Sequence, residues 1–143
     1  MKNALKKIAI QSPWLYRINT GSCNGCDVEL ATTALIPRFD VERFGCKYCG
    51  SPKHADIVLV TGPLTDKMRD KVLHVYHEIP EPKVVVAVGI CPISGGVFRD
   101  SYAIKEPLDA YIPVDVNVPG CPPRPQAIID GIVKAVEIWK SKL

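Results

Sequence analysis

The chain contains six cysteines whose spacing suits metal binding. Two pairs come first, Cys23-x-x-Cys26 and Cys46-x-x-Cys49, and single cysteines follow at positions 91 and 121. Three disulfides are a poor explanation, because disulfide frameworks belong to oxidising compartments and to small chains with poor cores. A chain of 143 residues, 47% of them hydrophobic, is long enough to bury a real core. The cysteines therefore favour metal chemistry.

Four thiolates are what a cubane iron–sulfur cluster requires. Cys23, Cys91 and Cys121 each follow a segment that reads as a strand, and ligands of a doubly wound sheet sit beyond the carboxyl ends of its strands. These cysteines can thus converge on one edge of a sheet. The glycines of their loops either form simple turns or let backbone amides approach the sulfurs; they are Gly21, Gly25, Gly89, Gly95, Gly96 and Gly120.

A zinc ribbon is the competing metal site. Nineteen residues separate Cys26 from Cys46, and this spacing of two C-x-x-C pairs also fits structural zinc. Ribbon knuckles sit on short hairpins, however, whereas residues 27–36 have a helical pattern. Zinc would also leave Cys91 and Cys121 as idle thiols.

The segments around the cysteines alternate between strand and helix patterns. Continuous apolar runs predict buried strands, and periodic apolar residues predict helices that end near prolines. The predicted strands are 14–18, 56–61, 83–88 and 111–116, the last at an edge because of Pro113, and the helices are 27–36, 65–79 and 126–140. Residues 37–54 read as irregular. This order predicts a three-layer α/β fold with a mostly parallel sheet, in one domain covering residues 1–143.

The composition excludes several classes of function. A net charge of +3, with lysines spread over both ends, gives no basic tract for nucleic acid. No window reaches the ~18 apolar residues that a membrane span requires, and the N-terminus lacks the features of a secretory signal. We expect the chain to stay inside the cell and to reach a membrane only through partners.

Five segments together resemble one family. They read SPWLYRINTGSCNGCDVE, PRFDVERFG, GSPKHADIVLVTGPLT, VAVGICPISGG and VPGCPPRPQAI, and they cover nearly the whole chain from Ser12 to Ile138. They resemble the small, cluster-bearing subunit of membrane-bound energy-converting (group 4) nickel–iron hydrogenases. That subunit is homologous to the 20 kDa cluster subunit of respiratory complex I. The complex I subunits have two adjacent cysteines in the first motif, whereas Cys23-Asn24-Gly25-Cys26 has the hydrogenase spacing.

The resemblance implies an oxidoreductase subunit with a flavodoxin-like fold and one 4Fe–4S cluster. By motif, the ligands would be Cys23, Cys26, Cys91 and Cys121. The nickel–iron centre would belong to a hydrogenase large subunit, so this chain would transfer electrons between that subunit and ferredoxin-like clusters in another. Membrane subunits would couple the flow to ion translocation, at the cytoplasmic side of the cell membrane. A complex-I-like or sulfur-reducing relative without nickel is the alternative.

Several positions stay open at this stage. Cys46 and Cys49 replace expected aliphatic residues, and could be small buried residues, a redox-active pair, or ligands shared with a partner, with His54 nearby. Asp27 and Glu29 could relay protons or simply favour the first turn of a helix. Arg124 could stabilise an anionic cluster or form a surface ion pair. His74 and His77 have no third ligand nearby and read as surface residues.

Overall fold

The computed structural model describes residues 12–104 and 106–143. Its centre is a five-stranded parallel sheet in the order β2-β1-β3-β4-β5, which is the flavodoxin-like order. The strands are β1 (Trp14–Asn19), β2 (Lys47–Tyr48), β3 (Ile57–Thr61), β4 (Val84–Val88) and β5 (Val116–Val118). The predicted α/β class is confirmed, and every strand pairing in the described sheet is parallel.

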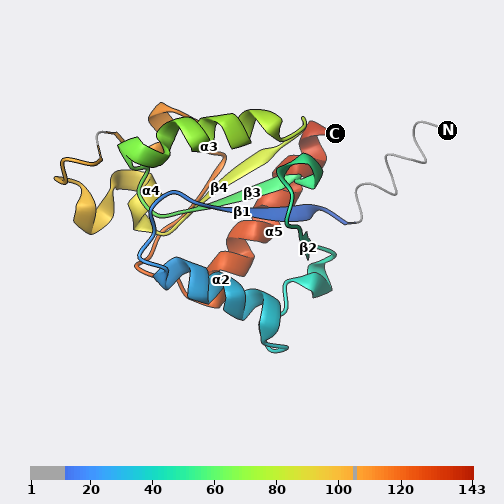
Figure 1. Ribbon diagram of the computed structural model, residues 1–143. Coiled ribbons are helices and arrows are strands. Elements are labelled where there is room, and N and C mark those ends of the chain that lie inside the picture. Colours follow the sequence, from blue (N-terminus) through green and yellow to red (C-terminus); the bar gives the residue numbers. More distant parts are fainter. Residues whose placement is uncertain (1–11, 105) are drawn as a thin grey trace.

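Helices cover both faces of the sheet, giving three layers (Figure 1). The helix α3 (Asp66–Glu78) lies on one face, and α2 (Gly25–Leu35) and α5 (Pro125–Lys142) lie on the other. A short helix, α4 (Ile90–Ser94), follows β4 directly. Short 3₁₀ turns occupy Glu42–Phe44, Pro52–His54, Gly96–Phe98 and Leu108–Ala110.

The central strands β3 and β4 are buried at every residue, as their continuous apolar sequences predict. Their side chains alternate between two apolar clusters, because successive residues of a strand point to opposite faces. Leu59 and Val86 pack toward α5, whereas Val60 and Val85 pack toward α3. This double burial fixes the register of the sheet and therefore the level at which each strand ends.

The strand predicted over residues 111–116 is wrong. The observed strand β5 begins at Val116, and the residues before it form a 3₁₀ turn and an irregular connection. Ile112 belongs to this connection, and its side chain is buried in the apolar cluster under α3. The carboxylate of Asp115 accepts a hydrogen bond from the Val85 amide at 2.9 Å. A side chain thus satisfies a backbone donor of β4 just before β5 starts.

The segment predicted to be irregular contains one more strand. β2 has only two residues and pairs with the beginning of β1, Trp14 with Lys47 and Leu15 with Tyr48. The sheet is therefore bounded by a two-residue strand on one side and the three-residue strand β5 on the other.

Truncating the apolar face of α5 should destabilise the fold. Ile132 is fully buried between α5 and the sheet, so Ile132→Ala should lower the free energy of unfolding by about 2–5 kcal/mol through lost burial and an unfilled cavity. Urea denaturation measures this change. Val97→Ala is the control, because Val97 is 85% exposed and its truncation should change stability little. Equal effects of the two substitutions would contradict the described core.

Candidate metal centre

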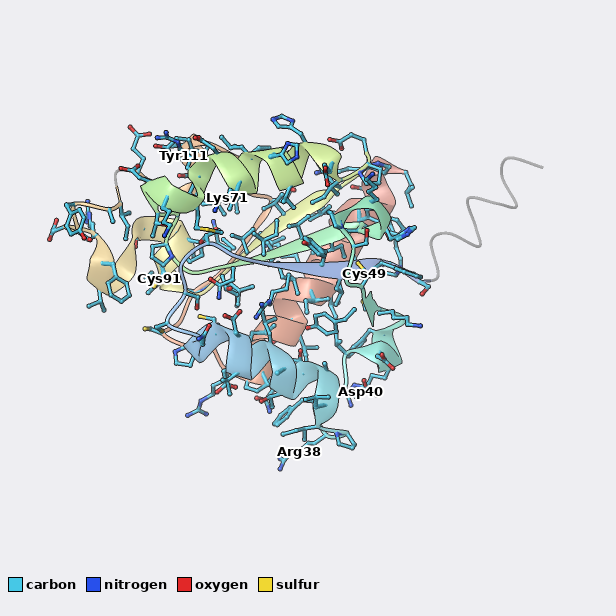
Figure 2. All side chains as sticks on the ribbon, viewed as in Figure 1. Arg38, Asp40, Cys49, Lys71, Cys91 and Tyr111 are labelled. Atoms are coloured by element: carbon cyan, nitrogen blue, oxygen red, sulfur yellow. The ribbon has the colours of Figure 1, made fainter. Side chains whose placement is uncertain are left out.

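The register of the sheet brings four loops to one edge. Asn19 pairs with Thr61, Thr61 with Val88, and Val88 with Val118, so four neighbouring strands end at the same level. Three of these loops, those after β1, β4 and β5, carry the four cysteines that the motifs single out. Cys23 and Cys26 lie at the start of α2, Cys91 in α4, and Cys121 between β5 and α5. Figure 2 shows Cys91 at this edge, on the left of the molecule.

The four thiols lie close enough to influence one another's ionisation. Burial raises the pKa of Cys26 from 9.0 to about 11, and negative charge on Cys91, Cys23, Asp27 and Cys121 adds to the rise. Burial also raises the pKa of Cys91, with further contributions from Cys121 and Cys23. Cys26 and Cys91 are buried, whereas Cys23 and Cys121 are exposed. The structure thus brings together thiols from three separate loops, which is what the sequence predicts.

Two backbone hydrogen bonds join the loop after β4 to the loop after β5. The Gly89 amide donates to the Val118 carbonyl oxygen at 2.8 Å, and the Ile90 amide donates to the Gly120 carbonyl oxygen at 2.9 Å. Gly89 has a φ of 92°, and a Cβ atom there would lie 2.7 Å from the Cys26 sulfur. At this position glycine does more than form a turn, because only the missing side chain lets the backbone approach the thiol.

The turn between Cys23 and Cys26 depends on a left-handed residue. Asn24 has a φ of 69°, and it is the one non-glycine residue with a positive φ in the described ranges. Asparagine tolerates this conformation better than most residues. The sequence Cys-Asn-Gly-Cys therefore suits a tight turn that places Cys23 just before α2 and Cys26 in its first turn.

Sequence reasoning missed a group of polar residues at the strand ends. Thr20 is fully buried, and its hydroxyl lies 2.8 Å from the Gly62 carbonyl oxygen and 3.0 Å from those of Thr61 and Pro63. This side chain ties the loop before Cys23 to the loop after β3. Polar residues that directly follow an apolar strand, as Asn19 and Thr20 follow Ile18, are the signal that could have found them.

The two carboxylates after Cys26 have different surroundings. Asp27 is 8% exposed and contacts side chains from β1 and β3. Glu29 lies on α2 and is half-buried. Asp27 is thus an internal structural contact of the loop, and a proton relay through these residues stays a prediction.

Helix dipoles and a cation favour negative charge at this edge. Both α2 and α5 begin here, so their positive ends face the region of the cysteines. Arg124 is exposed and precedes the first residue of α5. Partial positive charge from the helices would stabilise thiolates once a metal had displaced their protons.

Cys46 and Cys49 lie at the other end of the sheet. They flank β2, which pairs with the first residues of β1, and Figure 2 shows Cys49 opposite Cys91. Cys46 is 2% exposed in the core cluster under α5, whereas Cys49 packs against the cluster under α3. Because the two side chains point to opposite faces of the sheet, they do not form a redox pair. Of the three interpretations of Cys46 and Cys49, the one that treats them as small packing residues fits the structure best.

The same register argues against the zinc ribbon. Cys23 follows the end of β1, and Cys46 lies beside its beginning, so the two pairs are separated by the length of β1, roughly 16 Å at the rise of an extended strand. Residues 27–35 between them are helical, as predicted. Over residues 12–104 and 106–143, no three His, Cys, Asp or Glu side chains gather closely enough to hold a single metal ion.

The three histidines serve as packing and surface residues. His54 is exposed and its ring lies 5.8 Å from that of Trp14. His74 and His77 are exposed on α3, as predicted; His74 Nε2 lies 3.5 Å from Glu78 Oε1, and the His77 ring lies 5.7 Å from Tyr76.

The chain without a bound metal should lose stability as the pH rises above about 9. Burial raises the pKa of both Cys26 and Cys46 from 9.0 to about 11 in the folded chain. Between these values the unfolded chain loses thiol protons that the folded chain retains, so the free energy of unfolding falls with rising pH. Urea denaturation from pH 7 to 11 tests this. Cys46→Ala should show a smaller fall, and a flat profile for the parent chain would contradict the raised pKa values.

A protein-family model matches most of the chain. The model of the NADH ubiquinone oxidoreductase 20 kDa subunit matches residues 23–135, a range that includes all four cysteines of the edge. The chain belongs to this family. The 20 kDa subunit family and its relatives are oxidoreductase subunits, which confirms that part of the sequence analysis.

Relatives in this family are subunits of hydrogenases and respiratory complexes. The chain is 56% identical over 133 residues to the probable membrane-bound hydrogenase subunit mbhJ of Pyrococcus furiosus, covering 93% of this chain and 79% of the relative. It is 43% identical over 143 residues to formate hydrogenlyase subunit 7 of Escherichia coli, covering 100% of this chain and 56% of the relative. The predicted likeness to hydrogenase small subunits is thereby confirmed.

Solved structures agree on the fold. The membrane-bound sulfane sulfur reductase, an archaeal respiratory membrane complex, contains a chain with a TM-score of 0.82 and 37% identity, over 99% of this chain and 77% of that one. An NAD⁺-reducing NiFe-hydrogenase matches with a TM-score of 0.69 at 18% identity, over 88% of this chain and 92% of that one, and this likeness supports the fold alone. No helix of residues 12–104 or 106–143 is long and apolar enough to cross a membrane.

Proposed function

We propose that this chain is the electron-transferring small subunit of a membrane-bound nickel–iron hydrogenase complex. It would hold one 4Fe–4S cluster on Cys23, Cys26, Cys91 and Cys121, in a single iron–sulfur domain over residues 1–143. The observation that carries the proposal is the meeting of thiols from three separate loops at the carboxyl edge of the sheet. The 56% identity to a probable membrane-bound hydrogenase subunit supports the choice of complex.

The chemistry of the four thiols fits such a cluster. Burial and mutual repulsion keep Cys26 and Cys91 protonated at neutral pH, so a ligand must bring positive charge before they become thiolates. Iron supplies that charge. A cubane takes one thiolate at each iron, so its ligands surround a group of atoms, which agrees with four cysteines that do not converge on a single ion.

A 4Fe–4S cluster, when bound, supplies reversible one-electron chemistry. The residues of this chain would hold it and limit its exposure to water. Cys26, Cys91 and Gly89 form the inner side of the site, against the strand ends, and Cys23 and Cys121 form the outer side. Electrons would enter and leave at the exposed side, between a hydrogenase large subunit and a ferredoxin-like cluster subunit.

The loop after Cys91 supplies a docking surface beside the site. Val97 is 85% exposed, Phe98 42% and Tyr102 97%, an unusual concentration of exposed apolar side chains. We assign this surface to the large subunit, since a contact there would shorten the path between the two metal centres. Membrane subunits of the same complex would hold the chain at the cytoplasmic side of the membrane and couple electron flow to ion translocation.

Metal and sulfide analysis tests the proposal. The chain purified without oxygen should contain about four iron and four acid-labile sulfide per molecule, with one reducible cubane signal. Zinc without sulfide would contradict it.

A sulfur-reducing complex is the second candidate. The structural match to the membrane-bound sulfane sulfur reductase at a TM-score of 0.82 favours it. The cluster and its ligands would be the same, and the large subunit would lack nickel. Nickel analysis of the intact complex separates the two, because one nickel per large subunit supports the hydrogenase and its absence supports the alternative.

A further inference from the structure

One side chain contacts both ends of the loop that carries Cys23 and Cys26. Asn19 is the last residue of β1, and its Oδ1 accepts hydrogen bonds from the amides of Gly21 and Ser22, both at 2.9 Å. Its Nδ2 donates to Asp27 Oδ2 at 2.7 Å and lies 3.3 Å from Asn24 Oδ1. Asn19 therefore connects the start of the loop to its far end in the first turn of α2.

Asp27 extends this network to a second strand. Its other oxygen, Oδ1, accepts a hydrogen bond from the Thr61 hydroxyl of β3 at 2.8 Å and lies 3.1 Å from Arg17 Nη1 of β1. Thr61 is fully buried, and Asp27 is 8% exposed. The carboxylate thus anchors the beginning of α2 to β1 and to the end of β3, a strand that is buried at every residue.

The loop needs such an anchor because it lacks the usual one. Asn24 occupies the N-cap position of α2 in a left-handed conformation, and no side chain caps the helix there. A helix start without a cap leaves backbone donors unsatisfied and frays easily. The contacts of Asn19 and Asp27 take over the task of fixing the loop.

We infer that Asn19 and Asp27 form a polar clamp, which sets the separation of Cys23 and Cys26 before a cluster is inserted. The inference rests on the proposed function, because that function assigns a cluster to this loop. Asn19 is a positioning residue, since it acts on the cysteines through the backbone and through Asp27. A preset loop loses less conformational freedom when its ligand binds, and so retains the ligand longer.

Three variants and a control separate the parts of the clamp. Asn19→Ala removes every contact of the side chain. Asn19→Asp keeps an oxygen for the amides of Gly21 and Ser22 but places a second carboxylate against Asp27. Thr61→Val keeps the side-chain shape and removes one donor to Asp27. Asn117→Ala is the matched control, because Asn117 is an exposed asparagine on β5.

The first measurement is amide hydrogen exchange in the full-length chain without metal. Asn19→Ala should speed exchange at residues 20–26 by about tenfold, the change expected for a lost hydrogen bond, and Asn117→Ala should leave it unchanged. Asn19→Asp should keep Gly21 and Ser22 protected while residues 24–27 exchange faster. Thr61→Val should speed exchange at residues 25–28 alone. Exchange in Asn19→Ala that matches the parent would overturn the clamp.

The second measurement is the rate of iron loss to a chelator from the full-length chain reconstituted without oxygen. Asn19→Ala should lose iron about tenfold faster than the parent chain and the Asn117→Ala control, while the thermal midpoint of the metal-free chain changes little. Faster exchange with unchanged iron loss would overturn the positioning role and leave the proposed function intact. A parent chain that takes up no iron would overturn the proposed function, and the inference with it.

Discussion

The variant Cys121→Ser should fold normally and give no signal from a 4Fe–4S cluster. Cys121 is exposed in the loop between β5 and α5, so its replacement leaves no cavity in the core. A serine hydroxyl ionises far less readily than a thiol and is a poor ligand for iron–sulfur clusters. The iron content should fall from about four per chain toward zero, and electron paramagnetic resonance of the reduced protein should show no cubane signal.

The control for this experiment is Cys49→Ser. Cys49 lies at the opposite end of the sheet, where its thiol donates to the Ser51 carbonyl oxygen at 3.4 Å, and a serine hydroxyl can make the same contact. Iron content and signal should match those of the parent chain. An intact cluster in Cys121→Ser, or a lost one in Cys49→Ser, would count against the proposed ligand set.

Gly89→Ala should damage both the fold and the site. The backbone of Gly89 has a φ of 92°, which strains any residue with a Cβ atom, and that atom would lie 2.7 Å from the Cys26 sulfur. Relief requires a movement of β4 or of the first turn of α2, which hydrogen bonds and the sheet register oppose. We expect the free energy of unfolding of the metal-free chain to fall by about 2–4 kcal/mol.

Urea denaturation measures this loss, and iron analysis should show little cluster in Gly89→Ala. The matched control is Gly50→Ala, because a Cβ atom at Gly50 would meet no atom within 4 Å. Wild-type stability together with a full cluster in Gly89→Ala would mean that the approach of the loop to Cys26 is not required.

The sequence predicted the elements with strong local signals. The continuous apolar runs of β3 and β4 and the apolar face of α5 identified these elements to within two residues at either end. The convergence of Cys23, Cys91 and Cys121 followed from the rule that parallel strands end together. Such predictions succeed because each signal lies within one segment, and the segment has a single way to bury its apolar face.

The predictions that failed concern features that depend on contacts between distant segments. The sequence YIPVDV resembles a strand, yet Ile112 is buried under α3, and Asp115 uses its side chain to contact β4 before β5 begins. β2 is too short to have a pattern of its own and exists only by pairing with β1. The contact between Asp27 and Thr61 likewise joins α2 to β3, so no local pattern could have indicated it.

The outer strands of the sheet constrain how a larger assembly can form. Unpaired edges invite another chain to add a strand, and long, flat edges are the usual sites of such association. Here the edge strand on one side of the sheet is β2, with only two residues, and the edge strand on the other side is β5, with only three. Within residues 12–104 and 106–143, a neighbouring subunit would gain almost no backbone pairing from either strand, so recruitment there would rely on side chains of the helices and of the loops that carry the cysteines. In the proposed complex, single surface substitutions that leave the sheet untouched would therefore be able to change affinity and partner choice.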